Sequence, residues 1–188
     1  MLYPSVRQQS SGSTAFAVVT IIVAKLLLLH LMGRPFSCNC GVVTLWQGGL
    51  DPSQNSQQFA DHYSLLHAGF GMILIQWLAW MRPHWRFSDL LVVVVASSAI
   101  WEIMENTPLI IARFGMLGSD LHYSGDSLLN SLGDTIFVLA GAVLAMKLSR
   151  LATLVLVTTI EITVYLLIGD SILFGMFRFF AGSTMGHA

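Results

Sequence analysis

Ionisable side chains interrupt five long hydrophobic segments of this chain. They are Lys25, His67, Glu102 with Glu105, Asp134 and Glu161. Ionisable groups inside membrane segments are costly and generally mark functional sites. The four carboxylates outnumber Lys25, the one fixed cation among them, and uncompensated buried carboxylates take up protons or bind a cation. The group therefore predicts a metal site, a set of shared protons or a receptor for a cationic group.

The composition predicts that these segments lie in a membrane. The chain has 188 residues, of which 55% are hydrophobic and only 10% are charged. Its mean hydropathy is +0.71. A soluble domain could not keep so little charge on its surface and stay dispersed. The net charge of −1 leaves no basic face for nucleic acid.

The hydrophobic runs predict one all-α, polytopic membrane bundle over residues 1–188. Five candidate spans are long enough to cross about 30 Å of hydrocarbon at 1.5 Å per residue; they cover residues 14–32, 61–81, 89–106, 127–146 and 151–169. Long apolar runs favour helices over the alternating segments of a barrel. A sixth run, 172–180, is too short to span and predicts an interfacial C-terminal helix.

Basic residues concentrate in the two short links between spans. They are Arg82, His84, Arg86, Lys147 and Arg150. The positive-inside rule places these links in the cytoplasm. The predicted topology has a cytoplasmic tail (1–13), external loops (33–60 and 107–126) and an external C-terminal segment (170–188).

Depth and periodicity bring the ionisable groups together. Counting from the cytoplasmic ends, Glu102 and Asp134 each lie thirteen residues, or about 20 Å, into the membrane. Asp126, Asn130 and Asp134 are spaced i, i+4 and i+8 and share one helix face. Glu102 and Glu105 are three residues apart and also face one way.

Several motifs resemble those of a known family. They are Gly-Arg-Pro-Phe-Ser-Cys-Asn-Cys-Gly (33–41), Leu-Trp-Gln-Gly (45–48), Trp-Glu-Ile-Met-Glu-Asn-Thr-Pro-Leu-Ile-Ile (101–111) and Tyr-Ser-Gly-Asp-Ser-Leu-Leu-Asn-Ser-Leu-Gly-Asp-Thr (123–135). Their order resembles a family of small bacterial inner-membrane proteins known only as a domain of unknown function. The resemblance implies a bacterial inner-membrane location and no activity. There is a fainter likeness to VanZ-like membrane proteins.

The residues themselves suggest a division of roles around a divalent metal, with zinc, calcium and magnesium left open. His67, Glu102 and Asp134 are the predicted metal ligands, and His62, at the mouth of the bundle, is a further candidate. Glu105 is the predicted general base, with Asp126 beside it. Asn106 and Asn130 are predicted to support the ligands or an oxyanion. Lys25 balances charge or contacts a phosphate.

An interhelical hydrogen-bond network is the alternative to a functional site. Such networks join membrane helices, and Ser127, Asn130 and Ser131 suit one. Four carboxylates do not, because alcohols and amides would serve without the ionisation penalty. Cys38 and Cys40 lie in a predicted external loop, where a structural role is favoured over metal binding, redox chemistry or docking of a partner.

Three functions remain open from the sequence. The favoured one is a metal-dependent hydrolase or transferase that acts on a lipid or lipid-linked substrate from the outer leaflet. The second is a non-catalytic subunit or assembly factor whose loops dock a periplasmic or membrane protein. The third is a proton or small-cation carrier, which the apolar inner halves of the spans disfavour.

Overall fold

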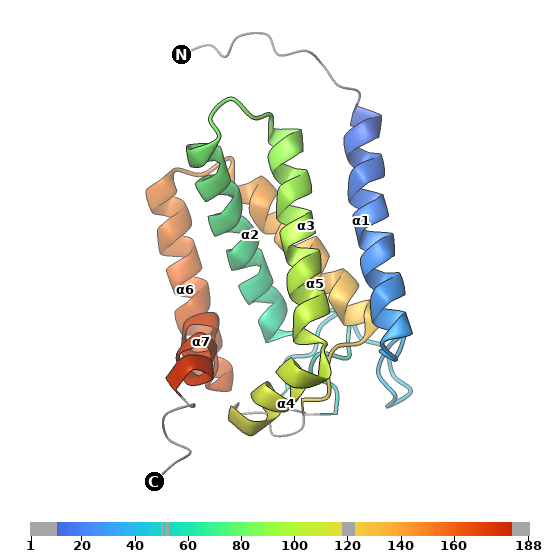
Figure 1. Cartoon of the computed structure of the whole chain (residues 1–188). Coiled ribbons are helices and arrows are strands. Elements are labelled where there is room, and N and C mark those ends of the chain that lie inside the picture. The colour runs from blue at the N-terminus through green and yellow to red at the C-terminus, as the bar shows by residue number, and fades with distance from the viewer. Residues whose placement is uncertain (1–10, 50, 52, 118–122, 182–188) are drawn as a thin grey trace.

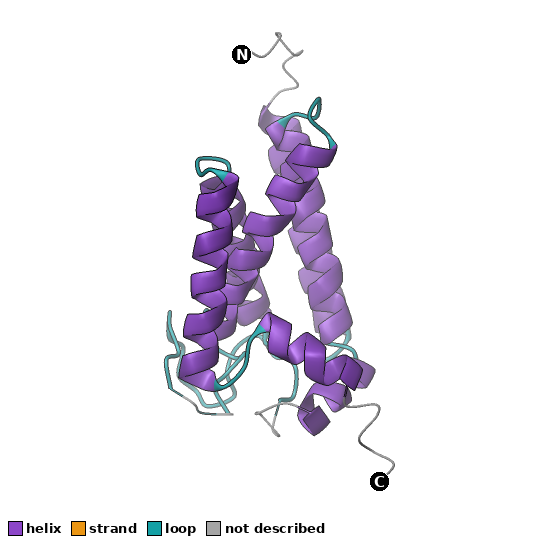
Figure 2. Cartoon of the chain, turned by 90° about the vertical axis from the view of Figure 1, so that its left-hand side faces the viewer, coloured by secondary structure: helices purple, strands orange, loops and turns teal. Residues whose placement is uncertain are grey.

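Seven α-helices make up the described part of the chain in the computed structural model, and Figures 1 and 2 show helices and loops there but no strand. The described residues are 11–49, 51, 53–117 and 123–181. The helices are α1 (Ser11–Leu31), α2 (His62–Met81), α3 (Phe87–Glu105), α4 (Pro108–Leu117), α5 (Leu128–Ala145), α6 (Arg150–Ile168) and α7 (Ile172–Ala181). Parts of the predicted tail 1–13, the loops and the segment 170–188 lie outside the described residues.

Five of the helices are long and apolar enough to cross a membrane, which confirms the predicted helical membrane bundle. Their bounds follow the predicted spans to within three residues at each end. Side chains that cap the helix ends explain these bounds: Asp61 accepts hydrogen bonds from the first turn of α2, and Ser127 does so for α5. Gly169 ends α6 with a φ of 70°, a left-handed conformation that glycine adopts without strain.

Helix α4 lies inside the predicted external loop 107–126 and is an addition to the predicted helices. The structure ends α3 at Glu105 and starts α4 at Pro108. Proline is favoured at the first helical position. A backbone N–H there has no intrahelical acceptor, so proline loses no hydrogen bond by lacking one. The same residue therefore both stops α3 and starts a second helix.

The connections are divided between the two ends of the bundle (Figure 1). The start of α1, the α2–α3 link and the α5–α6 link lie at one end, called here the short-link end. The long connections lie at the other end together with α4 and α7, which contact each other. This is the arrangement that the five-span topology requires, and it puts all the long connections on one side of the membrane.

Helices α2 and α5 form the closest helix pair, and glycines make this approach possible. A Cβ on Gly71 would lie 2.2 Å from the backbone oxygen of Val138, and one on Gly141 would lie 2.1 Å from that of Ala68. Small residues at such contacts let membrane helices approach backbone to backbone. This close packing holds the site-bearing faces of α2 and α5 together.

We expect Gly141→Ala to lower the free energy of unfolding by about 2 kcal/mol, because the added methyl group forces α2 and α5 apart. Unfolding in mixed detergent micelles measures the change. Gly69→Ala is the matched control, since its Cβ would meet only the Val157 side chain at 3.5 Å. Equal stability of the two variants would contradict this account of the α2–α5 contact.

Apolar side chains fill the half of the bundle near the short-link end. The buried cluster consists of Met72, Ile75, Leu90, Val94, Val138, Ala142 and Ala145. These residues come from the short-link halves of α2, α3 and α5. The buried polar residues of the same three helices lie mainly in their opposite halves. The buried polar residues of these three helices therefore lie mainly near the end of the bundle that carries the long connections.

Candidate functional site

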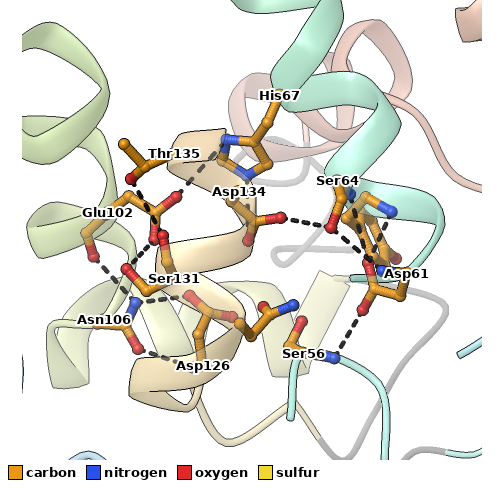
Figure 3. A network of polar contacts seen from close by, with 12 residues as sticks. Ser56, Asp61, Ser64, His67, Glu102, Asn106, Asp126, Ser131, Asp134 and Thr135 are labelled. Carbon is orange, nitrogen blue, oxygen red and sulfur yellow. Dashed lines mark hydrogen bonds and ion pairs between the residues drawn. The ribbon is translucent and has the colours of Figure 1, made fainter. Parts of the chain in front are cut away.

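His67 of α2 lies between two buried carboxylates from two other helices (Figure 3). Its Nδ1 atom is 3.6 Å from Glu102 Oε1 of α3, and its Nε2 atom is 3.9 Å from Asp134 Oδ2 of α5. Both distances exceed a normal hydrogen bond. The ring therefore faces one carboxylate with each nitrogen but is hydrogen-bonded to neither.

Glu102 is the most deeply buried acid of this site, with 0% of its surface exposed. The Ser131 hydroxyl donates to Glu102 Oε2 at 2.6 Å. Glu102 Oε1, in contrast, is buried without a hydrogen-bond partner among the described residues. Buried carboxylate oxygens nearly always have partners, so this atom is free to accept from a water molecule or to bind a cation.

Lys25 reaches the same place from α1 and is only 1% exposed. Its Nζ atom donates to the Ser131 backbone oxygen at 2.7 Å and to Thr135 Oγ1 at 2.6 Å. Both partners belong to α5, so this side chain joins α1 to the centre of the bundle. Its positive charge lies in the field of Glu102 and Asp134.

Asp134 is fixed from the start of α2 by a short chain of hydrogen bonds. The Ser64 hydroxyl donates to Asp134 Oδ1 and accepts from the Asp61 backbone N–H at 3.1 Å. Asp61 in turn accepts from the Ser64 backbone and from the Ser56 N–H. Asp61 and Ser64 were not among the predicted site residues. Their spacing, an acceptor followed three residues later by a polar side chain, is the signature of a capping box.

A second acidic pair lies next to the first, toward the long connections. It consists of Glu105 at the end of α3 and Asp126 just before α5, and the charge of Asp126 acts on the Glu105 carboxyl. Asn106 joins them to the cluster: its Nδ2 atom donates to the Glu102 backbone oxygen at 2.9 Å and to Asp126 Oδ2 at 2.6 Å. Its Oδ1 atom accepts from the Asp126 N–H at 2.7 Å. Asn106 thus ties the end of α3 to the start of α5.

Burial, and then the negative charge of Glu102, raises the pKa of the Asp126 carboxyl to about 7. Hydrogen bonds from Asn106 and from the Tyr123 hydroxyl, the latter at 3.1 Å, oppose this shift. Burial and the charge of Asp126 also raise the pKa of Tyr123 well above its ordinary value. Asp126 can therefore exchange a proton near neutral pH, whereas Tyr123 stays protonated and donates.

The geometry rearranges the predicted metal ligands. His67, Glu102 and Glu105 each offer one ligand atom, and these atoms lie within 4.8 Å of one another. Glu102 faces Nδ1 of the His67 ring, and Asp134 faces Nε2 on the other side of the ring. One ion bound at Nδ1 would therefore not also reach Asp134. Glu105, predicted as the base, is thus grouped with His67 and Glu102, whereas Asp134, predicted as a ligand, lies on the other side of the ring.

The remaining predicted residues lie outside this centre. The His62 ring contacts the Trp46 ring edge-on at 5.5 Å. Glu161 accepts from the Leu173 N–H at 3.4 Å, so it lies against α7 and, within the described residues, is not one of the three grouped ligands. The sequence predicted that all five segments bring their ionisable groups together. Glu161 does not join them, because the helix face that carries it is turned toward α7.

Three further predicted residues lie in the loop after α1 and on α5: Cys38, Cys40 and Asn130. The structure joins Cys38 and Cys40 in a disulfide within the loop after α1, which suits the structural role favoured from the sequence. Asn130 is 2% exposed, as the shared face with Asp126 and Asp134 predicts. Its Nδ2 atom is buried without a hydrogen-bond partner in the part of the chain that the structure describes.

A family model described as a protein of unknown function (DUF2585) matches residues 29–180. This range holds every predicted site residue except Lys25. The chain belongs to this family. The match confirms the resemblance to a family of unknown function that the motifs suggested, whereas the fainter likeness to VanZ-like proteins finds no support.

Similar proteins in bacteria carry the name UPF0314 protein. One from Sphingopyxis alaskensis is 38% identical over 160 residues, which are 85% of this chain and 85% of that protein. One from Sinorhizobium fredii is 34% identical over 173 residues, covering 88% and 84%. One from Novosphingobium aromaticivorans is 38% identical over 151 residues, covering 76% and 74%. No solved structure matches the chain.

Proposed function

We propose that the chain is a membrane-embedded, metal-dependent hydrolase or transferase that acts on a lipid or lipid-linked substrate. The observation that carries this proposal is Glu102 Oε1, a fully buried carboxylate oxygen with no hydrogen-bond partner among the described residues. It faces His67 Nδ1 at 3.6 Å, and Glu105 completes the set of three ligand atoms. A divalent cation would satisfy all three at once.

The residues fit such an ion. Two ligand atoms that each lie about 2.1 Å from one metal are at most about 4.2 Å apart. The separation of 3.6 Å between His67 Nδ1 and Glu102 Oε1 falls within that limit, whereas the full set with Glu105, within 4.8 Å, would have to close slightly around the ion. Histidine nitrogen and carboxylate oxygen are both zinc ligands, and three protein ligands would leave a fourth position for water, as in catalytic zinc sites. When bound, the metal would polarise a carbonyl or phosphoryl oxygen and lower the pKa of a water molecule.

The surrounding side chains have distinct tasks under this proposal. Asp134 faces His67 Nε2 at 3.9 Å, and its charge would favour the tautomer that carries the proton on Nε2 and leaves Nδ1 free to bind metal. Asp126, with its pKa near 7, takes up or releases a proton next to Glu105. Lys25 offsets the charge of Glu102. Asn130 Nδ2 offers a donor for an oxyanion.

We also propose a bacterial inner-membrane location with the N-terminus in the cytoplasm and the C-terminus outside. The basic residues Arg82, Arg86, Lys147 and Arg150 all lie at the short-link end. The positive-inside rule makes that end cytoplasmic. The site then lies in the outer half of the membrane, and its substrate would come from the outer leaflet.

The one-sided arrangement favours an enzyme over a carrier of protons or small cations. A carrier needs polar groups along the whole path. Beyond His67, toward the short-link end, the buried cluster around Met72, Val94 and Val138 is apolar. The third alternative, a non-catalytic subunit, would need no unsatisfied carboxylate oxygen in its interior.

Metal content and chelator-sensitive chemistry test the proposal together. The protein is purified in a mild detergent, analysed for metals, and incubated with a bacterial lipid extract whose products are read by mass spectrometry. We expect close to one divalent metal ion per chain and lipid products that disappear after chelation. Metal-free protein would overturn the metal site, and metal-bound protein that leaves every lipid class unchanged would overturn the enzyme.

A further inference from the structure

The loop that follows α1 exposes an unusual amount of apolar surface. We call residues 36–46 the apolar loop. Its exposed large side chains are Phe36 (73%), Val42 (55%), Val43 (62%), Leu45 (78%) and Trp46 (44%). Soluble surfaces rarely gather so many large apolar side chains in one segment. The sequence from 35 to 50 also contains no Asp, Glu, Lys, Arg or His. Something other than water should cover this loop.

The apolar side chains are held outward by a hydrogen-bonded backbone. The Thr44 N–H donates to Gln58 Oε1 at 2.8 Å, and Gln58 Nε2 donates to the Val42 oxygen at 3.1 Å. The Thr44 oxygen accepts from the Phe59 N–H at 3.2 Å. Gln58 is fully buried, so the backbone hydrogen-bonding groups on this side of the loop have partners inside the protein. Val43 and Leu45 therefore project from the opposite side of a fixed strand-like segment.

The loop continues the lipid-facing surface of α1. Leu31, the last residue of that helix, is 73% exposed, as Leu27 and Leu28 are exposed one turn earlier. The Phe36 ring packs at 5.6 Å against the His30 ring, which keeps the loop against the last turn of α1. Figure 1 shows the connection after α1 at the same end of the bundle as α4 and α7. This is the level at which a spanning helix meets the headgroups.

We propose that the apolar loop inserts into the headgroup region of the leaflet on the long-connection side, where it acts as a lipid-binding anchor. The occupant is the bilayer, because the exposed apolar side chains of the loop begin at Phe36, five residues after Leu31 at the exposed apolar end of α1. A segment of sixteen residues without charge suits the membrane interface, and aromatic residues such as Trp46 and Phe36 are enriched there. This inference is independent of the metal site.

Photo-crosslinking in bacterial membranes tests this anchor with the native cysteines in place. Leu45 is replaced by p-benzoylphenylalanine, whose ketone inserts into nearby C–H bonds on illumination, and Val43 is replaced in a second variant. Ser53, which is exposed in the polar turn with Asp51, is the matched control position. We expect a phospholipid mass added to the chain at 45 and 43, at least several-fold more than at 53.

Each other outcome overturns the anchor. A crosslinked dimer at 45 and 43 would mean that a second copy covers the loop, and a crosslink to a different protein would mean a protein partner. No adduct at either position, or equal lipid adducts at 45 and 53, would place the apolar loop in water. All variants keep Cys38 and Cys40, and gel mobility and yield report whether each one folds.

Discussion

Replacing Glu102 with glutamine will weaken divalent-metal binding by more than about 100-fold, since even residues that only orient a ligand cost 10–100-fold when changed. Glutamine keeps the shape of the side chain but removes the charge that attracts the ion. It can still accept from the Ser131 hydroxyl, as the glutamate does at 2.6 Å. Isothermal titration of metal into chelated protein in detergent measures the affinity.

Glu161→Gln is the matched control for this experiment. It makes the same chemical change in a membrane-spanning helix, but its side chain lies against α7 and contacts the Leu173 N–H. We expect its metal affinity to equal that of the wild type. If both variants bind metal as tightly as the wild type, Glu102 is not a ligand. If the two lose affinity equally, the loss comes from the charge of the membrane segment as a whole.

Replacing Lys25 with methionine will lower the free energy of unfolding by about 3 kcal/mol, because it removes the buried positive charge that offsets the carboxylates of Glu102 and Asp134. The variant also loses the bonds from Nζ to the Ser131 oxygen and to Thr135, which join α1 to α5. Chemical unfolding in mixed micelles gives the value. Lys147→Met, at an exposed position, is the control and should change stability by less than about 0.5 kcal/mol.

The double variant Lys25→Met with Glu102→Gln separates charge from packing. If Lys25 serves mainly to compensate Glu102, the double variant recovers much of the stability that the single lysine variant loses. Additive losses would mean that Lys25 acts through its hydrogen bonds to α5 alone. A double variant that is folded and binds no metal would also show that the loss of metal in Glu102→Gln does not come from misfolding.

Helix existence could be predicted because it depends on local composition. Runs of about twenty apolar residues are enough to identify spans, and Asp61 and Ser127 mark two of their starts as capping residues. α4 was missed for the opposite reason. Its ten residues are too short to stand out by hydropathy, and Pro108 indicates a helix end and a helix start equally well.

The amino-acid sequence by itself predicts which ionisable groups lie at a similar height along the helices, because rise per residue is a constant of the helix. It also determined that Asp126, Asn130 and Asp134 share a face. Which faces meet depends on how helices rotate and pack against one another, and only the tertiary structure decided this. Backbone contact at Gly71 and Gly141 sets that rotation for α2 and α5. It turns His67 toward Glu102 and Asp134, while Glu161, at a similar depth, faces α7 instead.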